Sequence, residues 1–146
     1  MATEILQKSR SRITAQSSSA LTADEYPGDG SYTLTSNCTT IDNKYTGGSE
    51  NGKGAEYLQL ELDVTSAPGT AAVAKIYWRG TNDGGTKWTK WKHSHTVGGD
   101  IETSADFYDA GLFVLTYKEI QLAVSAVDYG FTSVLYATPN LPEVQG

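Results

Sequence analysis

The chain has 146 residues, which fits a single domain whose core is large enough to need neither a disulfide nor a metal. Its formal net charge of −6 at pH 7 and its pI near 4.8 argue against nucleic-acid binding, because that function requires an excess of Lys and Arg. Cys38 is the only cysteine, so an intramolecular disulfide is excluded, and no apolar run approaches the roughly 20 residues of a membrane span. Because the N-terminus also lacks the apolar stretch of a secretory signal, we expect a soluble product of the cytosol with no membrane partner.

Residues 1–30 differ from the rest of the chain and predict an extended N-terminal arm. Lys8, Arg10 and Arg12 form a basic cluster, residues 17–19 are three serines, and residues 27–30 (Pro-Gly-Asp-Gly) form a turn cluster. Two interpretations stay open for the arm: a disordered leader, or a segment that orders on an acidic partner. In the second interpretation the three basic side chains are candidate contact residues.

From residue 31 onward apolar and polar residues alternate, and this period of two predicts strands. The clearest runs are Tyr57–Val64 and Lys118–Ala126, each with one apolar and one polar face, as in half-buried antiparallel strands. The other strands that we predict are Ser31–Ser36, Val73–Arg79, Lys87–Thr96, Asp100–Phe107, Leu112–Thr116 and Phe131–Ala137.

About eight short strands separated by regular turn signals are typical of an all-β fold with two packed antiparallel sheets. We therefore predict a jelly-roll-like β-sandwich over residues 31–137, with a closed barrel as the alternative. The Gly-rich residues 46–54 predict a long exposed loop between the first two strands. Residues 138–146 contain Pro139 and Pro142, so we expect an extended C-terminal tail that cannot supply a central strand.

Residue types that carry chemistry are present, but none forms a recognisable catalytic pattern. His93 and His95 would share one face of a strand, yet zinc takes three or four protein ligands and no second cysteine lies beside Cys38. No serine lies in a nucleophile elbow, and no phosphate-binding loop is present. A carboxylate pair for glycoside hydrolysis is not visible in a sequence, although acidic residues are numerous: Asp24, Glu25, Asp63, Asp83, Asp100, Glu102, Asp106 and Asp109. We predict no enzyme, no metal site and no cofactor.

Residues Thr81–Trp88 follow the Asp-box pattern, Ser/Thr-x-Asp-x-Gly-x-x-Trp, which predicts a hairpin. In such a hairpin Asp83 accepts hydrogen bonds from turn amides, Gly84 and Gly85 adopt positive φ, and the Trp folds back over the turn. Asp-boxes recur in sialidases and other carbohydrate-associated β-proteins, usually as repeats away from the catalytic residues. A single copy therefore predicts local structure and not a site.

Aromatic residues gather around this hairpin, among them Tyr77, Trp78, Trp88 and Trp91. Trp88 and Trp91 would fall on opposite faces of a regular strand, so at most one should enter the core. An exposed Trp beside lysines serves either a protein interface or a glycan, and we favour the protein interface. The candidate partner-binding residues are Lys8, Arg10, Arg12, Tyr45, Trp88 and Trp91.

Three segments read together resemble small structural proteins of tailed bacteriophages: residues 8–19 of the arm, the strand pair from Leu58 through Trp78, and the hairpin Thr81–Trp88. The resemblance implies a virion protein assembled in the host cytoplasm, a capsid decoration or cement protein, with tail or neck components as the next candidates. Its partners would be the major capsid protein or other virion proteins, and we expect a homo-oligomer. The alternative is a carbohydrate-binding or receptor-binding β-sandwich module associated with the tail.

Overall fold

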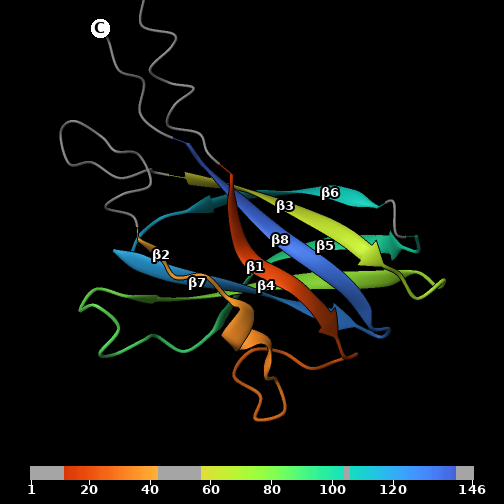
Figure 1. Ribbon diagram of the computed structural model, residues 1–146, viewed down its shortest axis with the longest axis horizontal. Coiled ribbons are helices and arrows are strands. Elements are labelled where there is room, and N and C mark those ends of the chain that lie inside the picture. The colour runs from red at the N-terminus through yellow and green to blue at the C-terminus, as the bar shows by residue number, and fades with distance from the viewer. Residues whose placement is uncertain (1–11, 43–56, 104–105, 141–146) are drawn as a thin grey trace, which may run out of the picture.

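The computed structural model describes residues 12–42, 57–103 and 106–140, and within these ranges eight strands form two four-stranded sheets (Figure 1). The first sheet has the order β1 (Ile13–Leu21), β8 (Phe131–Asn140), β3 (Tyr57–Ser66) and β6 (Phe107–Val114). The second has the order β2 (Ile41–Asp42), β7 (Glu119–Val127), β4 (Ala72–Thr81) and β5 (Lys92–Ile101). A short 3-10 helix, η1 (Leu34–Asn37), precedes β2. No helix in the described ranges is long and apolar enough to cross a bilayer.

The strand order confirms the predicted two-sheet sandwich and is that of a jelly roll. Four antiparallel pairs follow one another as in a single long hairpin: β1–β8, β2–β7, β3–β6 and β4–β5. Rolling that hairpin adds the pairs β3–β8 and β4–β7 and divides the strands between two sheets. The core lies between the sheets, where the alternating apolar residues of β3 and β7 are buried: Leu58, Leu60, Leu62, Val64, Ile120, Leu122, Val124 and Ala126.

The N-terminal boundary of the sandwich differs from the prediction, because residues 13–21 of the predicted arm form the edge strand β1. The strand buries Ala15, Gln16, Ser19 and Leu21, an irregular pattern caused by two register shifts against β8. Alternation of apolar residues therefore does not mark this strand in the sequence. Residues 1–11 lie outside the described ranges.

Three other predicted boundaries also change. Residues 31–36 contain no strand, and the last three of them belong to η1. Of residues 100–107, the first two end β5 and Phe107 begins β6, so they do not form a strand of their own. The predicted strand Lys87–Thr96 begins only at Lys92, so Trp88 and Trp91 lie in the β4–β5 loop. The predicted loop at residues 46–54 lies outside the described ranges.

The predicted C-terminal tail is wrong for residues 138–140, which belong to the central strand β8. On one side of β8, Pro139 pairs with Leu58 of β3. On the other side, the pairing with β1 extends only as far as Ala137, which pairs with Ile13. Because Pro139 lies beyond the end of β1, only one side of the backbone is paired there, so the missing N–H is tolerated.

The free side of β7 is closed by side chains instead of by a full strand, because β2 pairs with β7 only at Ile120 and Glu119. The backbone N–H of Val124 donates to Gln16 Oε1 (2.9 Å), and its carbonyl accepts from Tyr32 Oη (2.6 Å). Gln16 Nε2 donates in turn to Tyr32 Oη (3.0 Å), and the Cys38 thiol donates to the Leu122 carbonyl (3.1 Å). These contacts connect the segment before β2 to the core.

Candidate binding site at the end of β4

The β4–β5 loop folds as the Asp-box pattern predicts. Asp83 Oδ1 accepts a hydrogen bond from the Lys87 backbone N–H (3.0 Å) and one from the Thr81 hydroxyl (2.7 Å). Gly84 and Gly85 have φ of 73° and 92°, and the Trp88 ring lies against Gly85. The first of these hydrogen bonds, supported by the second, lowers the pKa of the Asp83 carboxyl below its ordinary value. The loop is therefore held in one shape by an ionised aspartate.

Arg79, on the outer face of β4, lies between the two loop tryptophans. Its guanidinium carbon is 4.7 Å from the Trp88 ring centroid and 4.9 Å from that of Trp91, and its Nε donates to Gln121 Oε1 (2.8 Å). Such cation–π contacts are stronger when partly desolvated, and burial here lowers the pKa of the guanidinium. Trp88 and Trp91 thus both contact the Arg79 guanidinium. The sequence had predicted that the two tryptophans lie on opposite faces of a strand.

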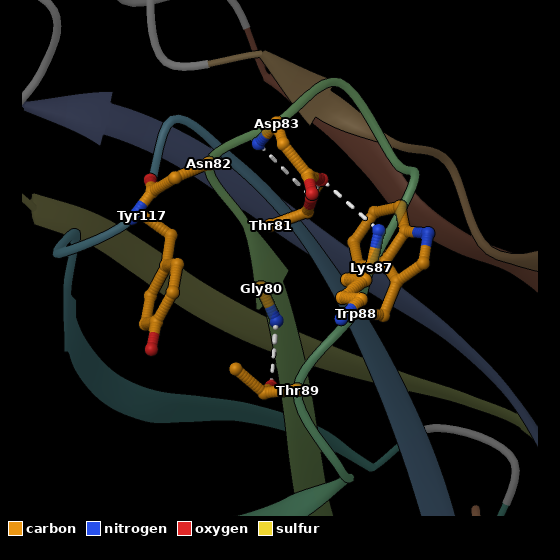
Figure 2. A pocket seen from close by; sticks show the side chains of 8 residues that line it. All are labelled: Gly80, Thr81, Asn82, Asp83, Lys87, Trp88, Thr89 and Tyr117. Carbon is orange, nitrogen blue, oxygen red and sulfur yellow. Dashed lines mark hydrogen bonds between the residues drawn. The ribbon is translucent and has the colours of Figure 1, made fainter.

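An open pocket of about 320 Å³ lies beside this loop, at the end of β4. Figure 2 shows its lining residues, with Tyr117 on one side, Trp88 on the other, and Gly80 and Thr89 between them. Its polar lining consists of Thr81, Asn82, Asp83, Lys87 and Thr89.

The pocket is held open by contacts between segments that are distant in the sequence. An ideal Cβ at Gly80 would lie 2.6 Å from Cγ of Tyr117, so only glycine allows that ring to lie where it does. Asn82 Oδ1 accepts from the Lys118 backbone N–H (2.9 Å), which joins the β6–β7 loop to the β4–β5 loop. The Thr89 hydroxyl accepts from the Gly80 N–H (3.0 Å).

Positive charge is concentrated around the pocket. The described ranges contain seven Lys and Arg residues, and five of them lie at this end of the molecule: Arg79, Lys87, Lys90, Lys92 and Lys118. The four lysines are exposed, and in the part of the chain that the structure describes none of their ammonium groups forms an ion pair. This basic end contrasts with the net charge of −6 for the whole chain.

The other predicted contact residues do not join this site. Arg12 lies beside β1, with its guanidinium 3.8 Å above the Tyr136 ring. Lys8, Arg10 and Tyr45 lie outside the described ranges. Tyr77, on the outer face of β4, stacks on Tyr26 and contacts His93, and burial raises its pKa.

The two histidines separate, contrary to the expectation that they share a strand face. A register shift at Ser94 pairs His93 with the outward Tyr77 and His95 with the buried Ile76. His95 Nε2 donates to the Leu112 carbonyl of β6 (2.8 Å) and so bridges the edges of the two sheets. Among the described residues no group of three or more His, Cys, Asp or Glu side chains is arranged to hold a metal.

Sequence reasoning missed Arg79, Asn82, Thr89 and Tyr117. Arg79 has a signal in the sequence, since it occupies an outward position two residues after Tyr77 on a strand that ends at the Asp-box. Tyr117 has none, because its position against Gly80 depends on the packing of two loops.

Comparison of the chain with protein-family models, with curated proteins and with solved structures gives no match in any of the three. The resemblance to phage structural proteins therefore stays a proposal that rests on the residues quoted for it.

Proposed function

We propose that this protein is a non-enzymatic structural component of a phage virion, a decoration or cement protein that binds the capsid shell. Two features support the proposal: the jelly-roll strand order, an architecture found in viral capsid domains as well as in lectins, and the surface of the edge strand β6.

The observation that carries the proposal is a row of exposed apolar side chains on β6. Phe107, Leu112 and Val114, here called the β6 row, are 51%, 58% and 56% exposed. They pair with Asp63, Gln59 and Tyr57 of β3, and these β3 positions alternate with the buried leucines, so the row faces away from the core. Asp109, which pairs with Glu61, lies on the same face between Phe107 and Leu112, so one carboxylate interrupts the row. Exposed apolar side chains on an edge strand mark a surface for another protein.

In the proposed mechanism, copies of the sandwich bind adjacent shell subunits and favour the assembled state, because a ligand of one state stabilises that state. Residues 1–11, with Lys8 and Arg10, would add affinity once the domain is docked, since a tethered segment binds at high effective concentration. Self-association belongs to the proposal as well, because edge strands need partners or protection.

The test is native mass determination, with the purified protein compared with a lysate in which it is produced together with its neighbouring genes. Co-migration with a megadalton shell supports the proposal. Removal of residues 1–11 should weaken that co-migration without unfolding the domain, because β1 begins only at Ile13. Leu112→Glu should abolish it, whereas Thr96→Glu, an exposed position on the outer face of β5, should leave it unchanged. A small free species in both samples, with the circular dichroism of a folded β-protein, contradicts shell binding.

A second candidate function is carbohydrate binding, as in a receptor-binding module. The pocket between Trp88 and Tyr117 favours it, because sugar rings stack on aromatic faces while their hydroxyls bond to amide and hydroxyl groups such as those of Asn82 and Thr89. A glycan screen followed by tryptophan fluorescence tests this candidate.

A further inference from the structure

We propose that the loop end, defined as residues 79–92 and 115–118, binds an anionic saccharide and selects it by charge as well as by shape. This inference rests on the carbohydrate-binding candidate and adds the chemical class of the ligand. It does not depend on shell binding.

Asn82 and Thr89 each have a hydrogen-bond donor left to bind a ligand. Asn82 uses its Oδ1 for the Lys118 N–H, while its amide nitrogen has no hydrogen bond to any residue in the described ranges. The Thr89 hydroxyl accepts from Gly80, which leaves its hydrogen to donate. Two polar donors therefore line a pocket whose other lining includes the rings of Trp88 and Tyr117 (Figure 2). This combination suits the hydroxyls and the apolar face of a sugar ring.

Four lysines give the loop end a positive charge. Lys87 lines the pocket, and the backbone of Lys118 is bonded to Asn82 at its rim. Lys90 follows on the same loop and Lys92 begins β5, and none of the four ammonium groups is neutralised by a described carboxylate. Asp83, the carboxylate within the lining, is ionised and has one oxygen bonded to the Lys87 N–H and the Thr81 hydroxyl, so the four lysines must attract an anion against this single negative charge. A carboxylate or sulfate on the sugar would gain charge-assisted contacts that a neutral sugar cannot make.

The shape of the site favours a saccharide over a nucleic acid. A groove for nucleic acid needs a basic track along its length, whereas here the cations gather at one end of a chain with a net charge of −6. The site is also small, near the lower limit of about 300 Å³ for ligand pockets. A single acidic sugar unit fits these properties better than a strand of bases.

The experiment compares hexagalacturonate with its fully methyl-esterified form, which has the same sugar backbone but neutral methyl esters in place of the carboxylates. Titration of the full chain, followed by tryptophan fluorescence and calorimetry, should show at least about tenfold weaker binding of the ester, and binding of hexagalacturonate should weaken with salt. The variant with both Lys87→Gln and Lys118→Gln should lose about tenfold for the acid and little for the ester. Both side chains are exposed, so the fold should be kept.

Lys75→Gln is the control for a distant charge, because it removes one of the two charges that the double variant loses, on β4 and about 16 Å along the strand from Gly80 at roughly 3.3 Å per residue. Its affinity for hexagalacturonate should equal that of the unmodified chain. Equal binding of acid and ester overturns the anionic class while keeping carbohydrate binding. Binding of neither, with no hit in the glycan screen, overturns both. Equally tight binding of a single-stranded DNA 12-mer shows a general polyanion site and overturns the saccharide.

Discussion

Gln16 offers the sharpest test of how this sandwich is held together. Its side chain is 1% exposed and makes three hydrogen bonds, accepting from the Val124 N–H and donating to Tyr32 Oη and the Leu34 carbonyl. The substitution Gln16→Leu keeps a similar volume and removes all three. Val124 then has a buried N–H without an acceptor, while the Tyr32 hydroxyl still donates to the Val124 carbonyl.

The expected loss follows from the cost of a buried polar group without a partner, about 1–3 kcal/mol each. Val124 N–H loses its acceptor in the core, and the Leu34 carbonyl loses a donor in a half-buried position. The extra apolar burial of leucine offsets part of this loss. We therefore expect the free energy of unfolding to fall by about 2–4 kcal/mol, which corresponds to a melting temperature lower by roughly 5–12 °C for a chain of this size.

The assay is urea unfolding followed by tryptophan fluorescence, in which the midpoint should fall while the slope stays constant. Thr14→Leu, the same polar-to-apolar change at an exposed position of β1, is the control and should cost less than about 0.5 kcal/mol. Tyr32→Phe should cost about 1–3 kcal/mol, and the double variant with Gln16→Leu should cost less than the sum, because the two side chains share a hydrogen bond. A Gln16→Leu protein as stable as the Thr14→Leu control would refute the assigned role of Gln16.

Two further predictions concern the end of β4. Gly80→Ala should destabilise the chain by about 1–3 kcal/mol, because its Cβ would lie 2.6 Å from the Tyr117 ring. The control Gly30→Ala has no atom within 4 Å of its Cβ and should melt near the temperature of the unmodified chain. Equal melting temperatures of the two variants would contradict the packing of Tyr117 on Gly80. The pKa of Asp83 is lowered, chiefly by the Lys87 N–H, so its contribution to stability should be present above the ordinary aspartate pKa and lost as the pH falls through the lower folded value. An NMR titration of the Asp83 carboxyl carbon measures this pKa. Asp83→Asn is the control and should remove the pH dependence of the Lys87 amide signal. A titration midpoint at or above the ordinary aspartate pKa would contradict the prediction.

The strands that the sequence predicts well are those whose inward and outward faces differ in polarity. In β3 the leucines and the polar residues alternate without interruption, and the burial along the strand follows them. In β1 the core accepts Gln16 because β7 needs a hydrogen-bonding partner at its free side. Ser19 is buried with its hydroxyl bonded to the Ser17 carbonyl and the Asn37 amide. A requirement created by a strand more than a hundred residues away leaves no periodic signal in the local sequence.

The same reasoning separates the predictable part of the site from the rest. The Asp-box is local: its hydrogen bonds join residues at most four positions apart, so the turn chemistry of Asp83 and the two glycines is visible in the sequence. The position of Trp88 beside Arg79 and the placement of Tyr117 depend on how β4 meets two loops. The residues missed by the sequence are those placed by long-range packing.

The two proposed binding surfaces differ in the force on which they depend, and this difference makes them separable. The β6 row presents apolar side chains, so its contribution to docking should be retained, or strengthened, in salts such as sulfate that favour apolar burial. The loop end presents unpaired ammonium groups, whose attraction for an anion is screened within about 8 Å at physiological ionic strength. Val114 ends β6 only a few residues before Tyr117, so the two surfaces adjoin and a bulky partner on one is expected to crowd the other. Shell binding that survives high salt while hexagalacturonate binding is lost would assign each function to its own surface.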